Sequence, residues 1–229
     1  MKLHGLQKMT LLDFPGRVAC TVFLGGCDFR CPFCHNGELL DGSAPAIMDD
    51  RELLRFLKGR QGLLDGVAIT GGEPLLRKDL PDLLRSVREL GFALKVDTNG
   101  NHPRALEGLL TEGLVDYVAM DIKNSPKKYA LTVGLDHLDL GPIRQSVRLL
   151  MDSSIPYEFR TTVVDQLHKA EDFEAIGRWI AGAKAYFLQS FTDRDSVPFA
   201  GLSAPTREDL DKYASIMRVY VPYTSIRGL

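Results

Sequence analysis

Two kinds of apolar segment alternate along the chain. Continuous apolar runs rich in β-branched residues predict buried strands at residues 17–24, 67–70, 92–96, 117–120, 157–164 and 185–188, with a last short run at 219–221. Segments with apolar residues on one helical face predict helices at residues 51–58, 79–90, 103–110, 142–151, 170–180 and 207–217. Asp49 or Asp50 can cap the first of these helices, and Gly91 can end the second.

This alternation of strands and helices predicts a parallel sheet with helices outside it. About six strand–helix units are visible, fewer than the eight that close a TIM barrel. We therefore expect an α/β fold: an incomplete (β/α)6-type barrel in a single domain, residues 1–229. Residues 1–16 are expected to form an N-terminal extension, 17–200 the partial barrel core, and 201–229 a C-terminal helix and strand.

Composition narrows the class of protein. The 229 residues are 25% charged and 45% hydrophobic, as in ordinary globular domains, and the formal net charge of −2 gives no basic footprint for nucleic acid. The sequence contains no apolar run of the roughly 18 residues that span a membrane, and its first residues lack the apolar region of a signal peptide. Four cysteines, three of them close together, indicate a reducing cytoplasm rather than a disulfide framework.

The densest chemistry lies in the stretch from Gly25 to Asn36. Cys27, Cys31 and Cys34 follow the spacing Cys-x3-Cys-x2-Cys, and such thiolate sets select zinc, copper(I) or iron–sulfur clusters. A [4Fe–4S] cube normally takes four cysteines, so three would leave one iron open. The alternative is a zinc knuckle with His35 as fourth ligand, which would be strained because His35 directly follows Cys34.

Polar residues follow five of the predicted strands. The cysteine stretch follows the first strand, and the others are followed by Gly71-Gly72-Glu73, Asp97-Thr98-Asn99, Asp121 with Lys123, and Gln189. Enzymes with barrel folds build their active sites at the C-terminal ends of the strands. We therefore expect these residues to meet at one rim of the barrel.

Each of these groups also has a simpler structural reading. The two glycines allow close approach of a ligand to the backbone, or they form a plain turn. The segment Asp97–Asn99 could bind ribose hydroxyls or a cation, or simply turn the chain. Asp121 and Lys123 share one face of a strand end, as a site or as a surface ion pair. His4, His102, His137 and His168 stand alone and are expected on the surface or in loops.

The cysteine spacing, with Phe33 before the last cysteine, is similar to the radical S-adenosylmethionine (SAM) superfamily. The resemblance implies that the open iron is chelated by the amino and carboxylate groups of SAM. It also implies that Phe33 lies beside the cluster and the adenine; the alternative is a plain aromatic residue of the core. Gly71-Gly72-Glu73 is similar to the signature that holds the SAM amino group. Arg160, which is rare in a buried strand unless paired, would then face the SAM carboxylate, or else Asp121 or Glu158.

Two further segments narrow the resemblance to activating enzymes of glycyl radical enzymes. Cys34-His35-Asn36 and the segment 11–16 (Leu-Leu-Asp-Phe-Pro-Gly) resemble the activating proteins of anaerobic ribonucleoside-triphosphate reductase. The resemblance implies cofactor contacts from Asp97 to Asn99, Asp121 and Lys123, and we add His35 and Gln189 as candidates for cofactor binding. Some such activases hold a monovalent cation, at positions matched by Asp97, Thr98 and Asp121. The chain departs at Gln189-Ser190-Phe191, where pyruvate formate-lyase activase has a histidine.

The mechanism implied by the resemblance needs two partners. An external donor such as flavodoxin would reduce the cluster, which would cleave SAM to methionine and a 5′-deoxyadenosyl radical. That radical would take a hydrogen from a glycine of the large subunit of the reductase. Two alternatives stay open: a small-molecule radical SAM enzyme similar to 7-carboxy-7-deazaguanine synthase, and a non-catalytic metal-binding module.

Overall fold

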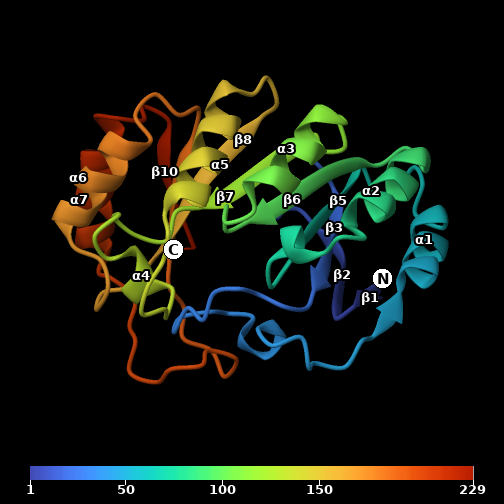
Figure 1. Ribbon diagram of the computed structural model, residues 1–229, viewed down its shortest axis with the longest axis horizontal. Helices are drawn as coiled ribbons and strands as arrows, with labels where there is room; N and C mark the ends of the chain where they lie inside the picture. Colours follow the sequence, from blue (N-terminus) through green and yellow to red (C-terminus); the bar gives the residue numbers. More distant parts are fainter. Residues whose placement is uncertain (229) are drawn as a thin grey trace.

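The computed structural model describes residues 1–228 and is built on one curved, open β-sheet (Figure 1). Within these residues eight strands form the sheet in the order β10-β9-β8-β7-β6-β5-β3-β2. Neighbouring strands are parallel, except that β2 runs antiparallel to β3 along one edge. The strands are β2 Gly5–Thr10, β3 Ala19–Leu24, β5 Gly66–Gly71, β6 Ala93–Thr98, β7 Tyr117–Asp121, β8 Tyr157–Val163, β9 Tyr186–Ser190 and β10 Thr224–Arg227. The predicted incomplete α/β barrel is confirmed.

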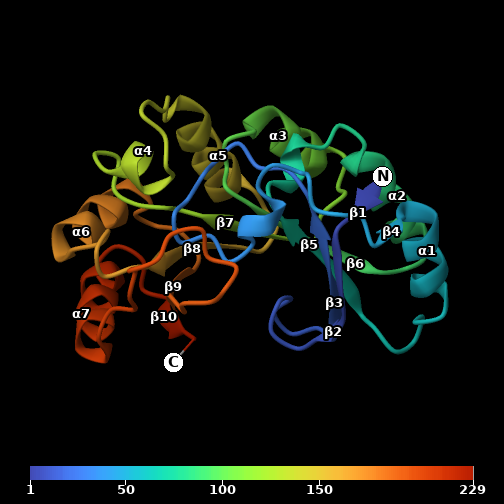
Figure 2. The same ribbon diagram turned by 90° about the horizontal axis from the view of Figure 1, so that it is seen from below.

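Helices cover the convex outer side of this sheet (Figure 2). They are α1 Asp50–Lys58, α2 Leu80–Glu89, α3 Pro103–Thr111, the short α4 Tyr129–Thr132, α5 Gly141–Asp152, α6 Ala170–Trp179 and α7 Arg207–Arg218. The fold also contains two 3-10 turns, η1 Gly37–Leu39 and η2 Pro74–Leu76. A small sheet is formed by β1 Lys2–Leu3 and β4 Met48–Asp49. Asp49 caps α1 as predicted, because Asp49 and Glu52 exchange side chain-to-backbone hydrogen bonds of 2.9 Å.

Successive side chains along a strand point alternately toward the helices and toward the inside of the barrel. In β8, Phe159 and Thr161 are fully buried, whereas Arg160 and Thr162, which alternate with them, line an inner cavity. Neighbouring strands continue this inner face, since Arg160 is in register with Asp121 of β7 and Thr162 with Gln189 of β9. The curved sheet thus gathers polar side chains from successive strand ends on its inner side.

Two features of the local structure differ from the expectations. The strand expected at 219–221 lies at Thr224–Arg227 instead, because Val219 caps the end of α7 and is 79% exposed. The N-terminal residues 5–10 pair with β3 as strand β2, which the sequence had not indicated. His168 lies in a loop, one of the two expected locations, although it is completely buried. The division of the chain at residues 16 and 200 stays a prediction.

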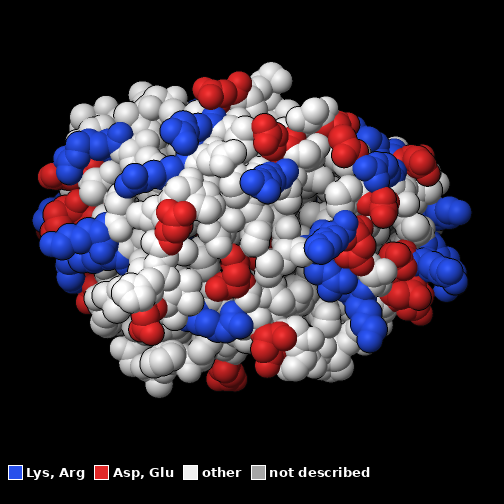
Figure 3. Space-filling view, in the orientation of Figure 1, with Lys and Arg blue, Asp and Glu red and all other residues white. Residues whose placement is uncertain are grey.

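Acidic and basic side chains both occur across the whole face shown in Figure 3, in keeping with the net charge of −2. No helix within residues 1–228 has the length and apolar character needed to cross a bilayer.

Candidate active site

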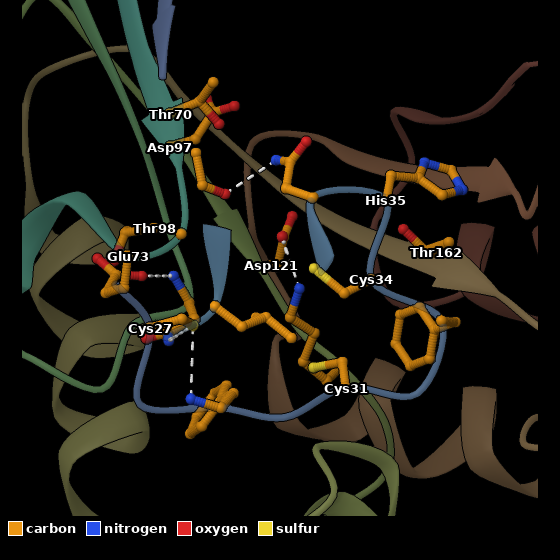
Figure 4. A pocket seen from close by; sticks show the side chains of 18 of the residues that line it. Cys27, Cys31, Cys34, His35, Thr70, Glu73, Asp97, Thr98, Asp121 and Thr162 are labelled. Carbon is orange, nitrogen blue, oxygen red and sulfur yellow. Dashed lines mark hydrogen bonds and ion pairs between the residues drawn. The ribbon is translucent and has the colours of Figure 1, made fainter. Parts of the chain in front are cut away.

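A cavity of about 250 Å³ lies between the cysteine stretch and the C-terminal ends of the parallel strands (Figure 4). The structure brings every residue that the sequence nominated to the wall of this one cavity. These residues are Cys27, Cys31, Phe33, Cys34, His35, Gly71, Gly72, Glu73, Asp97, Thr98, Asn99, Asp121, Lys123, Arg160 and Gln189. Their meeting at one rim is therefore confirmed as geometry, while the role of each stays a prediction.

Backbone hydrogen bonds to the turn that follows it shape the start of the cysteine stretch. Gly26 takes a positive φ of 94° and donates its N–H to Leu39 O at 2.8 Å. Cys27 and Cys34 are half-buried and Cys31 is buried, and all three carry free thiols. Burial raises the pKa of Cys31 to about 11 and that of Cys27 to about 12, so their thiolates need a positively charged centre nearby. Three thiols that border one cavity fit an iron–sulfur cluster as a donor set.

The zinc-knuckle alternative requires His35 to turn toward the sulfur atoms, and the structure places it elsewhere. The His35 ring points away from the cysteines, with Nε2 at 2.8 Å from Thr192 O, and it stacks on Phe191 with ring centroids 5.7 Å apart (Figure 4). Within residues 1–228, no group of three or more His, Cys, Asp or Glu side chains is arranged to hold a single metal ion. His35 instead joins the cysteine stretch to the segment that follows β9.

The glycines after β5 let two loops touch at the backbone. A Cβ on Gly71 would collide with Leu24, and one on Gly72 would collide with the carbonyl of Gly26. Two backbone hydrogen bonds of 2.8 Å cross the same contact, from Gly72 N to Leu24 O and from Glu73 N to Gly26 O. The second loop is therefore held directly against the cysteine stretch.

The carboxylate of Glu73 is buried and organises the end of β6. It accepts hydrogen bonds from Leu75 N at 3.0 Å, from the Thr98 hydroxyl at 2.8 Å and from Asn99 N at 2.6 Å. Burial nevertheless raises its pKa to about 7. An ammonium group of a ligand close to Glu73 would favour its ionised form.

Five charged side chains form a continuous ladder on the inner face, in the order Lys95, Asp97, Arg160, Asp121 and Lys123. Arg160 donates from Nε to Asp121 at 2.9 Å and from NH1 to Asp97 at 3.3 Å. Lys123 contacts Asp121 at 2.8 Å, and Lys95 pairs with Asp97. Burial disfavours ionisation of both carboxyls, but Arg160 and the lysines outweigh it and hold their pKa below the usual value, at about 2 for Asp121. The buried arginine is thus paired internally, with Asp97 as well as the expected Asp121.

Sequence reasoning missed several residues of this site. Asp28 accepts hydrogen bonds from Asn99 at 2.8 Å and Asn101 at 2.5 Å, and it lies 3.1 Å from His102 Nε2. This network fixes the loop after β6 against the cysteine stretch, so His102 is not the isolated histidine that was expected. The position of Asp28 inside the cysteine motif was a signal that could have marked it. Five further residues line the cavity without having been nominated: Phe29, Asn36, Leu40, Thr70 and Thr162.

Comparison with known proteins agrees with this geometry. The Radical SAM superfamily matches residues 21–180. A protein of Methanocaldococcus jannaschii named as a glycyl-radical enzyme activating enzyme, MJ1227, is 30% identical over 99% of this chain and 96% of its own length. A pyruvate formate-lyase-activating enzyme of Clostridium pasteurianum is 33% identical over 54% of this chain and 52% of its own.

The fold has close counterparts among solved structures. SuiB of Streptococcus suis, in a crystal structure with bound S-adenosylmethionine, superposes with a TM-score of 0.71 at 13% identity. The match covers 91% of this chain and 52% of SuiB, so at this identity it supports the fold alone. The match of the superfamily to residues 21–180 and the 30% identity with MJ1227 over 99% of this chain show the family as well as the fold. This chain belongs to the radical SAM superfamily, whose members use a [4Fe–4S] cluster together with S-adenosylmethionine.

Proposed function

We propose that this chain is a glycyl-radical-enzyme activating enzyme, which generates a radical on a backbone glycine of a partner protein. The observation that carries the proposal is the convergence on one cavity of three cysteine thiols and of the polar residues at four further strand ends. The alignment along the whole chain with a relative named as an activating enzyme of this kind supports it.

Cys27, Cys31 and Cys34 would hold the cluster, because their thiols border the cavity and the remaining polar groups leave room for a ligand on the fourth iron. Once bound, the cluster and SAM supply reductive cleavage of a carbon–sulfur bond of SAM, which yields a 5′-deoxyadenosyl radical. The chain itself supplies binding and orientation. Glu73 would receive the SAM ammonium group, and the net positive ladder that ends at Lys123 would attract the SAM carboxylate.

The open shape of the sheet suits a protein as hydrogen donor. Strands β2 and β10 form the two edges of the sheet and do not pair with each other, so the barrel is not closed around the cavity. A loop of a second protein could reach the cavity from the inner side. Glycine lacks a β-carbon, so its Cα can approach a radical at the roughly 3–3.5 Å that a near-attack geometry requires.

We further propose the large subunit of an anaerobic ribonucleotide reductase as that partner, an external donor such as flavodoxin as the source of the electron, and the cytoplasm as the location. The motif Cys34-His35-Asn36 and the segment 11–16 support this narrower assignment. In the structure His35 and Asn36 each tie the cysteine stretch to another loop, so the motif has a structural function at the site.

A deuterium-transfer experiment tests the proposal. The reconstituted, reduced enzyme is mixed with SAM and a partner protein whose glycines carry deuterium at Cα, and the 5′-deoxyadenosine is examined by mass spectrometry. We expect deuterium in the product, and none when the candidate glycine of the partner is replaced by alanine. Undeuterated product, together with conversion of a small molecule by this chain alone, would favour a small-molecule radical SAM enzyme instead.

A further inference from the structure

The four carboxylate oxygens of Asp97 and Asp121 each have one cationic partner from the chain itself. Arg160 bridges the two residues, with 3.3 Å to Asp97 Oδ2 and 2.9 Å to Asp121 Oδ1. Lys95 Nζ pairs with Asp97 Oδ1, and Lys123 Nζ lies 2.8 Å from Asp121 Oδ2. Three positive and two negative side chains therefore form one closed set of ion pairs with a net charge of +1.

The third position considered for a cation is also engaged. The Thr98 hydroxyl donates to Glu73 Oε1 at 2.8 Å and accepts from Gly100 N at 3.0 Å. Asp97, Thr98 and Asp121 were the positions at which the sequence resemblance implied a bound monovalent cation. Each oxygen of these three residues already has a partner within the chain, and the carboxylates lie among three positively charged side chains, so this arrangement does not fit a further cation among them.

The net charge of this set of ion pairs also disfavours a bound cation. Lys95 is 1% exposed, and the exposed fractions of the Arg160 and Asp97 side chains are 12% and 18%. Like charges repel strongly in such a partly dehydrated place, because water screens them little. A further cation there would raise the net charge of the set from +1 to +2. An added cation would offer the two carboxylates no attraction that Lys95, Arg160 and Lys123 do not already provide.

We propose that Lys95 and Arg160 supply from the chain the positive charge that a monovalent cation would bring, so that SAM binds in this pocket without Na⁺ or K⁺. The proposal rests on SAM occupying this pocket, as proposed above. Lys95 was not among the site residues nominated from the sequence. It lies two residues before Asp97 on β6, so both side chains share the inner face. It acts as a positioning residue, since it contacts Asp97 and does not line the cavity.

The test compares cations at constant ionic strength. The holoenzyme is exchanged into tetramethylammonium, Na⁺ or K⁺ chloride, SAM affinity is measured by equilibrium dialysis, and Na⁺ binding is followed by the sodium NMR line width. We expect SAM affinities within about twofold of one another and no saturable Na⁺ binding that K⁺ reverses. SAM binding that is about tenfold tighter in Na⁺ or K⁺, or saturable Na⁺ binding, would overturn the proposal.

Variants of Lys95 identify the residue responsible. In Lys95→Met, SAM affinity should fall about tenfold in tetramethylammonium and recover in part with K⁺ or Na⁺, whereas Lys95→Arg should stay independent of the cation. Lys212→Met, at an exposed position of α7, is the matched control. Wild-type SAM affinity of Lys95→Met in all three salts would refute the role of Lys95. If that variant does not fold, the salt dependence of SAM affinity and the sodium measurement, both made on the wild type, still decide whether a cation takes part. If the wild type binds no SAM in any of the salts, the proposal that SAM occupies this pocket is wrong. The sodium measurement then tests separately whether a cation binds there.

Discussion

The side-chain amide of Asn36 donates to the carbonyl oxygen of Gly71 at 2.9 Å, and this hydrogen bond joins the cysteine stretch to the end of β5. On one side of it lies Cys34, and on the other lies the loop that carries Glu73. The two loops that would hold the cluster and the SAM amino group are thus fixed relative to each other by a single side chain together with backbone contacts.

Replacing Asn36 by Ala should loosen this connection. The lost hydrogen bond should lower the free energy of unfolding by about 0.5–1.5 kcal/mol. Misplacement of the Glu73 loop should lower SAM cleavage by about ten- to a hundredfold. Gln7→Ala, which removes an exposed hydrogen bond to Met9, is the control and should change neither quantity. Denaturant titration and a SAM-cleavage assay measure both effects, and full activity of Asn36→Ala would contradict this role.

The three cysteines of the motif should behave differently from the fourth. Cys31→Ala should lose the charge-transfer absorbance of the cluster and all SAM cleavage, since one cluster ligand is removed. Cys20 is fully buried in β3 and does not line the cavity, so Cys20→Ala should retain both. Anaerobic reconstitution with iron analysis provides the measurement. Near-normal SAM cleavage by Cys31→Ala would be incompatible with the proposed cluster site.

A β-carbon at position 72 should disrupt the contact between the two loops. In Gly72→Ala the new methyl group would meet the Gly26 carbonyl, and overpacking of this kind costs about 1–3 kcal/mol of folding free energy. Gly108 in α3 offers a matched control, because a Cβ there meets nothing within 4 Å. Gly108→Ala should be neutral or stabilise by about 0.5–1 kcal/mol. Equal thermal stability of the two variants would show that the close approach at Gly72 is not required.

His168 should make stability depend on pH. In the neutral ring Val164 N donates to Nδ1 at 3.1 Å, and Nε2 donates to Lys123 O at 2.9 Å; Nδ1 also lies 3.2 Å from Val164 O, the acceptor that a charged ring would use. Burial lowers the pKa of His168, so below about pH 6.5 the unfolded chain takes up a proton that the folded chain resists. The stabilisation is therefore complete above pH 6.5 and declines as the pH falls, by at most about 1.4 kcal/mol per pH unit.

The comparison of two histidine variants checks this prediction. Urea unfolding of wild type and His168→Gln at pH 7.5, 6.5 and 5.5 should give curves that converge at low pH. His137 is exposed, so His137→Gln should keep the wild-type dependence. Parallel curves for wild type and His168→Gln would mean that His168 does not contribute.

The main strands and helices could be predicted from the sequence because their apolar periodicity is local. Strand β2 could not, since Gly5–Thr10 mixes exposed polar and apolar residues and is defined only by pairing with β3. The last strand was misplaced because Val221, which is buried beneath the end of α7, gives the same apolar signal as a strand.

The site could be predicted in outline and not in detail. Polar residues at strand ends point to a common rim because parallel strands bring those ends together. The partners of Arg160 could not be chosen, since Asp97 and Asp121 lie 63 and 39 residues away and meet it only through strand order. His102 was missed for the same reason, since its partner Asp28 lies 74 residues away. Lys95 is only two residues from Asp97, but its burial beside that carboxylate is visible only in the structure.

The electron paramagnetic resonance spectrum of the partner protein tests the central proposal most directly. The reduced holoenzyme, SAM and the large subunit of an anaerobic ribonucleotide reductase are mixed without oxygen, and the subunit is then examined. The proposed function predicts a glycyl doublet that requires SAM, is absent with Cys31→Ala, and disappears when the C-terminal glycine of the subunit is changed to alanine. Consumption of SAM by the wild-type enzyme without any radical on the subunit, while a small molecule is converted in its place, would contradict it.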